Sequence, residues 1–315
     1  MNFQLPFSPA GWKEQIDHRD PILLTGSCFS ENIGDKLTAL KFNVLQNPHG
    51  IIYDPVSITN SLVAGIDKVM IRGEDLAETG GLWHSWDHHG SFSGTDRAEV
   101  VSNINNTTVE THSFLSSAKW VFITLGSAFH YTLADSGRDV ANCHKFPAAT
   151  FSKNLLTIEE IKSSLDTCIH RLFHFNGNLK IIFTVSPVRY VRDGLVENNL
   201  SKARLIEVVQ HLVSKFTGIY YFPAYEIVND VLRDYRFFKE DLVHPSAQAV
   251  EYVFEQFAGS CFNPITLDLT REISSLNTAL SHRPLHPASE AHQKFTEGLM
   301  NRVAAFEKKY SWVKF

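Results

Sequence analysis

Five short apolar segments alternate with helix-like segments along most of the chain. Residues 22–25, 42–45, 120–125, 181–185 and 219–222 are rich in Ile, Val, Leu and Phe and are bounded by turn or polar residues. Runs of this kind are typical of strands that are covered on both faces. Helical patterns accompany them at residues 31–40, 56–69, 158–172 and 200–216. Strands that alternate with helices form right-handed crossovers, so the sequence predicts an α/β fold, a three-layer α/β/α sandwich around a five-stranded parallel sheet.

Two regions depart from this alternation. Residues 74–113 hold two tryptophans and four histidines among Gly and Ser, and we expect a long insertion there rather than a core helix. Residues 263–315 contain no strand pattern, and residues 267–280 and 287–309 are predicted to be helices. We therefore expect a main domain over residues 1–262 and a helical C-terminal appendage over residues 263–315. The amphipathic spacing of the appendage also fits a homo-oligomer contact.

Composition limits the partners and the location of the chain. The formal net charge is −5 and Lys and Arg are scattered, so we expect no nucleic-acid partner, because phosphate binding needs a clustered basic face. The four cysteines form no Cys-x-x-Cys pair, which is typical of free thiols in a reducing compartment. We find no secretory leader pattern and no apolar run near the ~20 residues of a membrane span. A cytoplasmic protein without a membrane partner is expected.

The first candidate for chemistry follows the first predicted strand. Gly26, Ser27 and Cys28 stand between that strand and the next helix. Glycine permits a sharp turn there, and the amide groups and dipole of a helix N-terminus lower the pKa of a thiol. We therefore expect Cys28, as a thiolate, or the adjacent Ser27 to be a nucleophile. The alternative is a buried, unreactive cysteine beside a helix-capping serine.

The second candidate lies far downstream, where Asp241 stands three residues before His244 and just ahead of a predicted helix. A carboxylate at this spacing can reach Nδ1 of the imidazole, which leaves Nε2 to take a proton from a thiol or hydroxyl. The pair follows the fifth predicted strand, where the loops at the C-terminal ends of a parallel sheet converge. The alternative is a surface pair that caps the helix beginning near Ser246.

Several longer strings along the chain resemble a known family. They are GSCF, NPHGIIYDP, ANCHKFP, TVSPVRYVRDG, NNLSKARL and YFPAYEIVNDVLRDYRFFKEDLVHP. Together they resemble the GSCFA-domain family up to about Phe257, and that family looks like a branch of the SGNH (GDSL-type) hydrolase superfamily. The resemblance implies a flavodoxin-like sheet with strand order 2-1-3-4-5 and a site built from a nucleophile, a His and an Asp.

The sequence blocks of the superfamily can be carried over residue by residue. The GDSL block places its nucleophilic Ser at Cys28 and its Asp at Ser27. The Asp-x-x-His block matches Asp241 and His244, and the block with an oxyanion-hole glycine matches Gly50.

The Gly-x-Asn block departs from the superfamily pattern. This chain has Gly126, Ser127 and Ala128 there, so the glycine is kept and the amide side chain is missing. Losing one oxyanion donor costs about 2.7–4 kcal/mol of transition-state stabilisation. Asn142 is our candidate for the replacement donor, and a turn-forming asparagine is the alternative.

Other polar residues in these strings are secondary candidates. Arg189 and Arg192 could bind a carboxylate or phosphate of a substrate. His144, like Asn142, is a candidate substrate-binding residue. Cys143 and His144 lack the spacing of a zinc site. We expect no metal and no other cofactor.

The sequence therefore predicts ester hydrolysis or acyl transfer on a small or carbohydrate-linked ester. Cys28 or Ser27 would attack the acyl carbon, with His244 as base and then acid, and Asp241 would orient the imidazole. The amides of Cys28 and Gly50 would hold the oxyanion. Two alternatives are a ligand-binding protein without turnover and a metal-dependent hydrolase that uses the histidines of residues 74–113.

Overall fold

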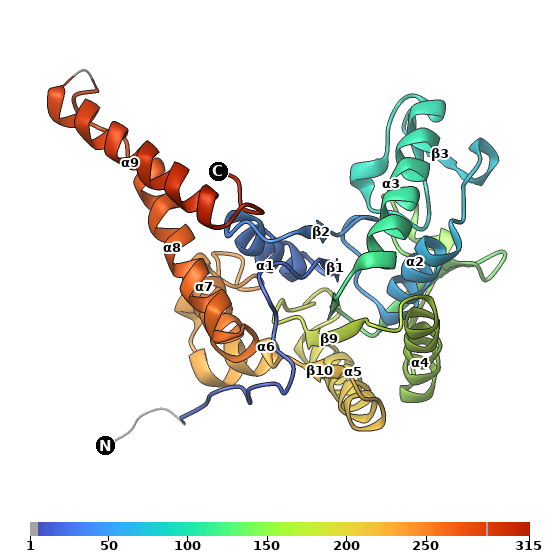
Figure 1. The fold of residues 1–315 in the computed structure, drawn as a ribbon. Coiled ribbons are helices and arrows are strands. Elements are labelled where there is room, and N and C mark those ends of the chain that lie inside the picture. Colours follow the sequence, from blue (N-terminus) through green and yellow to red (C-terminus); the bar gives the residue numbers. More distant parts are fainter. Residues whose placement is uncertain (1–5, 288) are drawn as a thin grey trace.

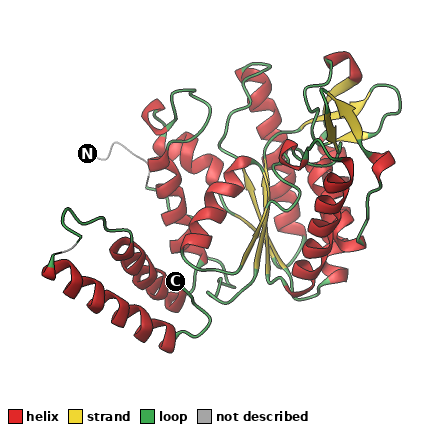
Figure 2. Cartoon of the chain, turned by 90° about the horizontal axis from the view of Figure 1, so that it is seen from above, coloured by secondary structure: helices red, strands yellow, loops and turns green. Residues whose placement is uncertain are grey.

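The computed structural model describes residues 6–287 and 289–315. At its centre is a five-stranded parallel sheet in the order β10-β9-β5-β1-β2. The strands are β1 (Ile22–Gly26), β2 (Val44–Gln46), β5 (Trp120–Leu125), β9 (Lys180–Val185) and β10 (Ile219–Tyr221). Figure 2 shows this sheet nearly edge-on with helices on both sides. The predicted three-layer α/β/α fold and the strand order 2-1-3-4-5 are confirmed.

Alternation along the strands builds one core on each face of the sheet. From β1, Leu23 points into a cluster with α2 (Pro55–Asp67), α4 (Ile158–Phe175) and α5 (Leu195–Lys215). Its neighbours Ile22 and Leu24 point into a second cluster with α1 (Cys28–Ala39) and α7 (Ala247–Cys261). Because both faces are covered, the strands have no polar side, and this explains their continuous apolar runs.

The region expected to be an insertion contains a helix. A hairpin of β3 (Ala77–Thr79) and β4 (Leu82–His84) is followed by α3 (Arg97–Ser117), which packs along α2. The expectation of no core helix is therefore wrong from residue 97 onward. Two threonines lie in the buried stripe of α3, and their hydroxyls donate to helix carbonyls, Thr108 to Ile104 and Thr111 to Thr107. Because these buried positions hold hydrogen-bonded threonines, the sequence does not show the apolar periodicity typical of a helix.

A second, small sheet was not predicted. It is antiparallel, in the order β7-β6-β8, and consists of β6 (Phe129–Leu133), β7 (Asp139–Val140) and β8 (Phe151–Leu155). β6 begins four residues after the end of β5, so this sheet lies at the C-terminal edge of the central sheet. It supplies one wall of the pocket described below.

The C-terminal residues form a helical hairpin that extends from the main domain (Figure 1). Its helices are α8 (Pro264–Leu280) and α9 (Glu290–Lys309), which share a small apolar cluster. Ala288, in the expected start of the second helix, lies outside the described residues. Asn277 donates to the Ala39 carbonyl over 2.7 Å, and the Trp312 indole N–H lies 3.1 Å from Nδ1 of His18. No helix in the described residues is long and apolar enough to cross a bilayer.

Candidate active site

The turn between β1 and α1 is fixed by a glycine that no other residue can replace without strain. Gly26 has φ +127°, and a Cβ built on it would lie 2.1 Å from the Thr124 carbonyl oxygen on β5. Ser27, which follows, caps α1 by accepting a hydrogen bond from the Phe29 N–H over 3.3 Å, and it is 1% exposed. Cys28 is the first residue of α1 and is only partly buried. The cap role and burial of Ser27 favour Cys28 as the nucleophile.

Asp241 and His244 form the pair that their spacing predicts. Oδ2 of Asp241 lies 2.7 Å from Nδ1 of His244, while Oδ1 accepts from the N–H groups of Val243 (2.8 Å) and His244 (3.0 Å). Leu242 between them takes φ +57°, which folds the loop tightly. The backbone donors and the imidazole hold the pKa of Asp241 at about 2. The carboxylate therefore stays ionised near neutral pH and orients the ring, leaving Nε2 available.

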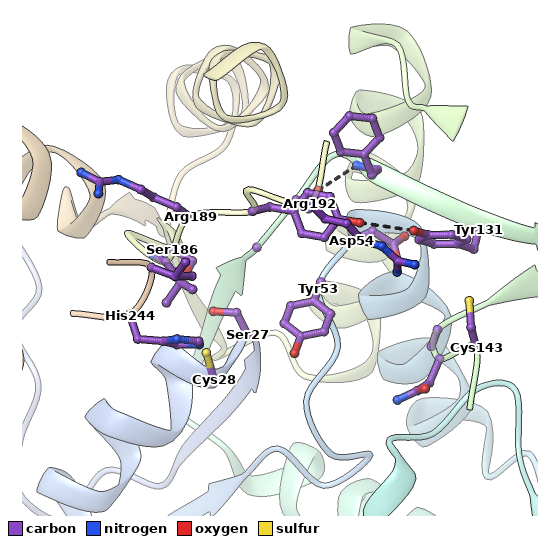
Figure 3. A pocket seen from close by; sticks show the side chains of 18 of the residues that line it. Ser27, Cys28, Tyr53, Asp54, Tyr131, Cys143, Ser186, Arg189, Arg192 and His244 are labelled. Carbon is purple, nitrogen blue, oxygen red and sulfur yellow. Dashed lines mark hydrogen bonds between the residues drawn. The ribbon is translucent and has the colours of Figure 1, made fainter. Parts of the chain in front are cut away.

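The two motifs meet in one pocket of about 360 Å³, which we call the Cys28 pocket. Figure 3 shows the His244 imidazole and the Cys28 thiol on the same side of this pocket, which both residues line. Within the described residues, no hydrogen bond joins His244 to Cys28 or Ser27. The other lining side chains are mostly aromatic or polar and include Tyr53, Asp54, Phe129, Tyr131, Ser186, Tyr190 and Arg192.

The Cys28 thiol is not the thiolate that its helix position predicts. Burial and the nearby Glu31 raise its pKa above the usual value. Its own backbone N–H and the charges of Lys202 and Lys239 lower the pKa, but by less. The expectation of a depressed pKa is therefore wrong, and the thiol needs a base to lose its proton.

Two of the predicted backbone oxyanion donors are already used. The N–H of Gly50 donates to the Asn47 carbonyl over 2.7 Å, and Gly50 does not line the Cys28 pocket. The N–H of Gly126, which does line it, donates to the Tyr53 carbonyl over 2.8 Å. Assigning the oxyanion to Gly50 is therefore wrong. Among the described backbone hydrogen bonds between residues, none uses the N–H of Cys28, so this amide is the donor left for an oxyanion.

Asn142 and His144, which belong to the same sequence string, lie in different places in the structure. Asn142 lines the Cys28 pocket, where its Oδ1 accepts from the His144 N–H over 2.9 Å and its amide nitrogen is left to donate. His144 lies outside the pocket, with Nε2 2.7 Å from the Ser85 carbonyl, and burial lowers its pKa to about 4. Asn142 therefore does form a turn, and the turn uses its side-chain oxygen and not its N–H donors. The prediction that His144 binds substrate is wrong.

Arg189 supports the loop that carries Asp241 and His244. Its guanidinium donates to the Leu242 carbonyl over 3.0 Å and lies 3.9 Å from the ring centroid of Phe238. Its backbone N–H donates to the Val243 carbonyl over 3.2 Å. In Figure 3 the side chain points away from Cys28. Arg189 also lines the Cys28 pocket, but its hydrogen bonds in the described residues support the loop.

Three of the four histidines of residues 74–113 are paired with serines, and Nδ1 of His112 lies 2.9 Å from the Ile66 carbonyl. Nδ1 of His84 lies 2.7 Å from the Ser93 hydroxyl, and Nδ1 of His88 lies 2.9 Å from the Ser85 hydroxyl. In residues 6–287 and 289–315, no group of three or more His, Cys, Asp or Glu side chains is placed to hold a metal ion. Cys143 lies at the far end of the Cys28 pocket (Figure 3), which neither His84 nor His88 lines.

An Asp–His–Asp chain behind the pocket wall was not predicted from the sequence. His130 is 4% exposed, and its Nδ1 and Nε2 lie 2.9 Å from Asp54 and 2.9 Å from Asp139. Asp54 also lines the pocket and caps α2 through the Ser57 N–H. Burial alone would lower the pKa of His130, but the two carboxylates raise it to about 9. The sequence did offer one signal for this chain, because Asp54 stands in the NPHGIIYDP string directly before a helix pattern.

We expect this Asp–His–Asp chain to stabilise the protein at neutral pH and to lose that effect at alkaline pH. A His whose pKa rises from 6.5 to about 9 on folding stabilises the protein fully below pH 6.5, and the effect is lost as pH rises through 9. The contribution is roughly 3 kcal/mol at most. Thermal melts of His130→Asn should therefore lie below wild type at pH 6 and converge with it near pH 10. His170→Asn, an exposed histidine 3.5 Å from Asp166, is the control. A difference in melting temperature between His130→Asn and wild type that stays constant with pH would contradict a stabilising charge on His130.

Comparison with known proteins places the chain in a family. A model of the GSCFA family matches residues 21–257, and a model described as GSCFA domain protein, C-terminal domain, matches residues 273–315. A search of curated proteins finds no match.

Solved structures with similar folds include several esterases. A carbohydrate esterase family 3 from Talaromyces cellulolyticus is 10% identical with a TM-score of 0.37, covering 81% of this chain and 99% of that one. A family 3 carbohydrate esterase from Clostridium thermocellum is 13% identical with a TM-score of 0.34, covering 80% and 98%. The family match covers most of the main domain, and the chain belongs to the GSCFA family.

Proposed function

We propose that this protein is a cysteine-dependent, SGNH-like hydrolase or acyltransferase that acts on an ester with a small or carbohydrate-linked acyl group. The observation that carries the proposal is the Asp241–His244 pair, joined over 2.7 Å, which shares one pocket with the Cys28 thiol. A nucleophile, a base and a residue that orients the base are the groups that acyl transfer needs.

The first half of the reaction forms a thioester. The Cys28 sulfur attacks the acyl carbon while its proton passes to Nε2 of His244, and the carbonyl electron pair moves onto oxygen. The Cys28 N–H is the donor that we assign to that oxyanion, and the Asn142 amide, which lines the same pocket, is our candidate for a second donor. Collapse of the intermediate breaks the ester C–O bond, and the leaving alcohol takes the proton from His244. Because the pKa of Cys28 is raised, proton removal accompanies attack instead of preceding it.

The second half releases the acyl group. A water molecule, or an acceptor alcohol in transfer, gives its proton to His244 and attacks the thioester carbon. The C–S bond breaks, and the Cys28 sulfur recovers its proton from His244. Asp241 stays ionised throughout because its pKa is held at about 2.

The dimensions of the pocket support a small acyl group and an alcohol with flat or sugar-like faces. Its volume is about 360 Å³, and Tyr53, Phe129, Tyr131 and Tyr190 line it. Aromatic faces present apolar area with polar edges, which suits ring-shaped alcohols. Arg192 also lines the pocket and offers a charge to an anionic substituent.

The test uses an activated ester and follows the acyl group. Incubation with p-nitrophenyl acetate should release p-nitrophenolate and leave an acetyl thioester on the peptide that contains Cys28, detected by mass spectrometry at low pH. Protein treated beforehand with iodoacetamide should release none. An acetyl group on Ser27 would favour a serine esterase instead. Binding of short acyl esters without any turnover would support the alternative of a ligand-binding protein.

A further inference from the structure

One face of α5 gathers the loops that surround the Cys28 pocket. Oδ1 of Asn198 accepts from the Tyr190 N–H over 2.8 Å, after β9. The Ser201 hydroxyl accepts from the Ala128 N–H over 2.7 Å, after β5. These residues belong to the NNLSKARL string, which the proposed reaction does not use.

Lys202, in the same string, is buried beneath the pocket. It is 1% exposed, and its ammonium donates to the carbonyls of Gly126 over 2.6 Å and Ser186 over 2.7 Å. Gly126 follows β5, Ser186 follows β9, and both line the Cys28 pocket. The ammonium therefore links the ends of two adjacent strands directly under the site.

The charge of Lys202 has no carboxylate to neutralise it. Its hydrogen-bond partners in the described residues are the two neutral carbonyls, and none of the ion pairs there includes it. Burying an ammonium in this way is unfavourable, and two acceptors leave one of its three protons unused. Below pH 7, where the group is charged, a buried ammonium without a carboxylate can stabilise negative charge that forms nearby.

We propose that Lys202 is a positioning residue for acyl transfer, which holds the Gly126 and Ser186 carbonyls and stabilises the negative charge that passes through the Cys28 sulfur to the oxyanion. It would thus replace in part the donor that is missing at Ala128. This inference rests on the proposed function only in taking Cys28 as the nucleophile.

Electrostatic coupling between the two side chains is consistent with this role. Burial lowers the pKa of Lys202 to about 7, and the Cys28 charge raises it. The Lys202 charge in turn lowers the pKa of Cys28 against burial and Glu31. Lys239, which acts on Cys28 in the same direction, is exposed, so solvent screens its effect more strongly.

The test is the rate of Cys28 alkylation by iodoacetamide at pH 6, read peptide by peptide, because the ammonium of Lys202 is charged below its pKa of about 7. In Lys202→Met this rate should fall, and a Cys28 pKa that rises by one unit makes labelling about tenfold slower. Lys202→Arg keeps the charge and should label at pH 6 at a rate close to wild type. Lys215→Met, at the exposed end of the same helix, is the matched control and should not change the rate.

The result that overturns the proposal is a folded Lys202→Met protein that labels at the wild-type rate at pH 6. Where Lys202→Met does not fold, Lys202→Gln takes its place, because its amide can still donate to a carbonyl without a charge. Loss of fold in both neutral variants would assign Lys202 a purely structural role and also overturn the proposal. Alkylation needs no substrate, so slower labelling of Lys202→Met, found for a protein that hydrolyses no ester, would reject the proposed function alone.

Discussion

Cys28→Ala is expected to lower turnover of an activated ester by several orders of magnitude and to leave the fold intact. Removing the nucleophile of an acyl-transfer site leaves only what binding and the oxyanion donors contribute. The side chain is small and partly exposed at the first position of α1, where alanine continues a helix well. The measurement is p-nitrophenolate release alongside a thermal melt.

Ser27→Ala is the matched comparison, because it changes the adjacent residue in the same turn. It removes the cap on the Phe29 N–H and should cost about 1 kcal/mol of stability, with turnover retained once the protein is folded. Full activity in Cys28→Ala together with its loss in Ser27→Ala would reverse the assignment of the nucleophile.

Asp241→Asn is expected to reduce turnover by about 10⁴-fold without unfolding the protein, because an amide at this position no longer fixes the ring proton of His244 on Nδ1. His244→Ala should reduce turnover at least as far. Since the pKa of Asp241 is about 2, its carboxylate should not titrate between pH 4 and 8 in the wild type.

The result that contradicts this role is equally specific. Asp241 accepts backbone hydrogen bonds from Val243 and His244, so a purely structural loop residue would show a lower melting temperature with unchanged turnover. Arg189→Lys provides a comparison, since it weakens the support of the same loop without touching the ring. Turnover that falls equally in Arg189→Lys and Asp241→Asn would show that loop position, and not the tautomer, limits the rate.

The central sheet could be predicted from the sequence because burial on both faces leaves a signal in every strand. The segments 120–125 and 181–185 are apolar at consecutive positions, and each forms a strand of the central sheet. The helix α3 gave no such signal, because Thr108 satisfies its buried hydroxyl on the Ile104 carbonyl of the same helix. The strands β6 to β8 are antiparallel and mixed in polarity, and their pairing depends on contacts that a local pattern does not contain.

The site could be predicted where its contacts are local in sequence. Asp241 and His244 are three residues apart, and their 2.7 Å contact follows from that spacing. The state of the Cys28 thiol could not be predicted, because the burial that raises its pKa comes from distant segments that fold over it. The bonds from Lys202 to Gly126 and Ser186 span 76 and 16 residues, and only the folded sheet brings them together.

The residues beneath the Cys28 pocket tolerate few substitutions, whereas the residues of its walls tolerate many. Gly26 admits no side chain beside Thr124, and Lys202 is locked under two strands. By contrast, Arg192 and Tyr190 stand on the loop between β9 and α5, and Tyr131 stands on the small second sheet. Substitutions in these walls can alter which alcohol or acyl group fits while the reacting groups keep their places. Substrate choice can therefore diverge through substitutions in the walls of the pocket, while each variant along the way stays folded and active.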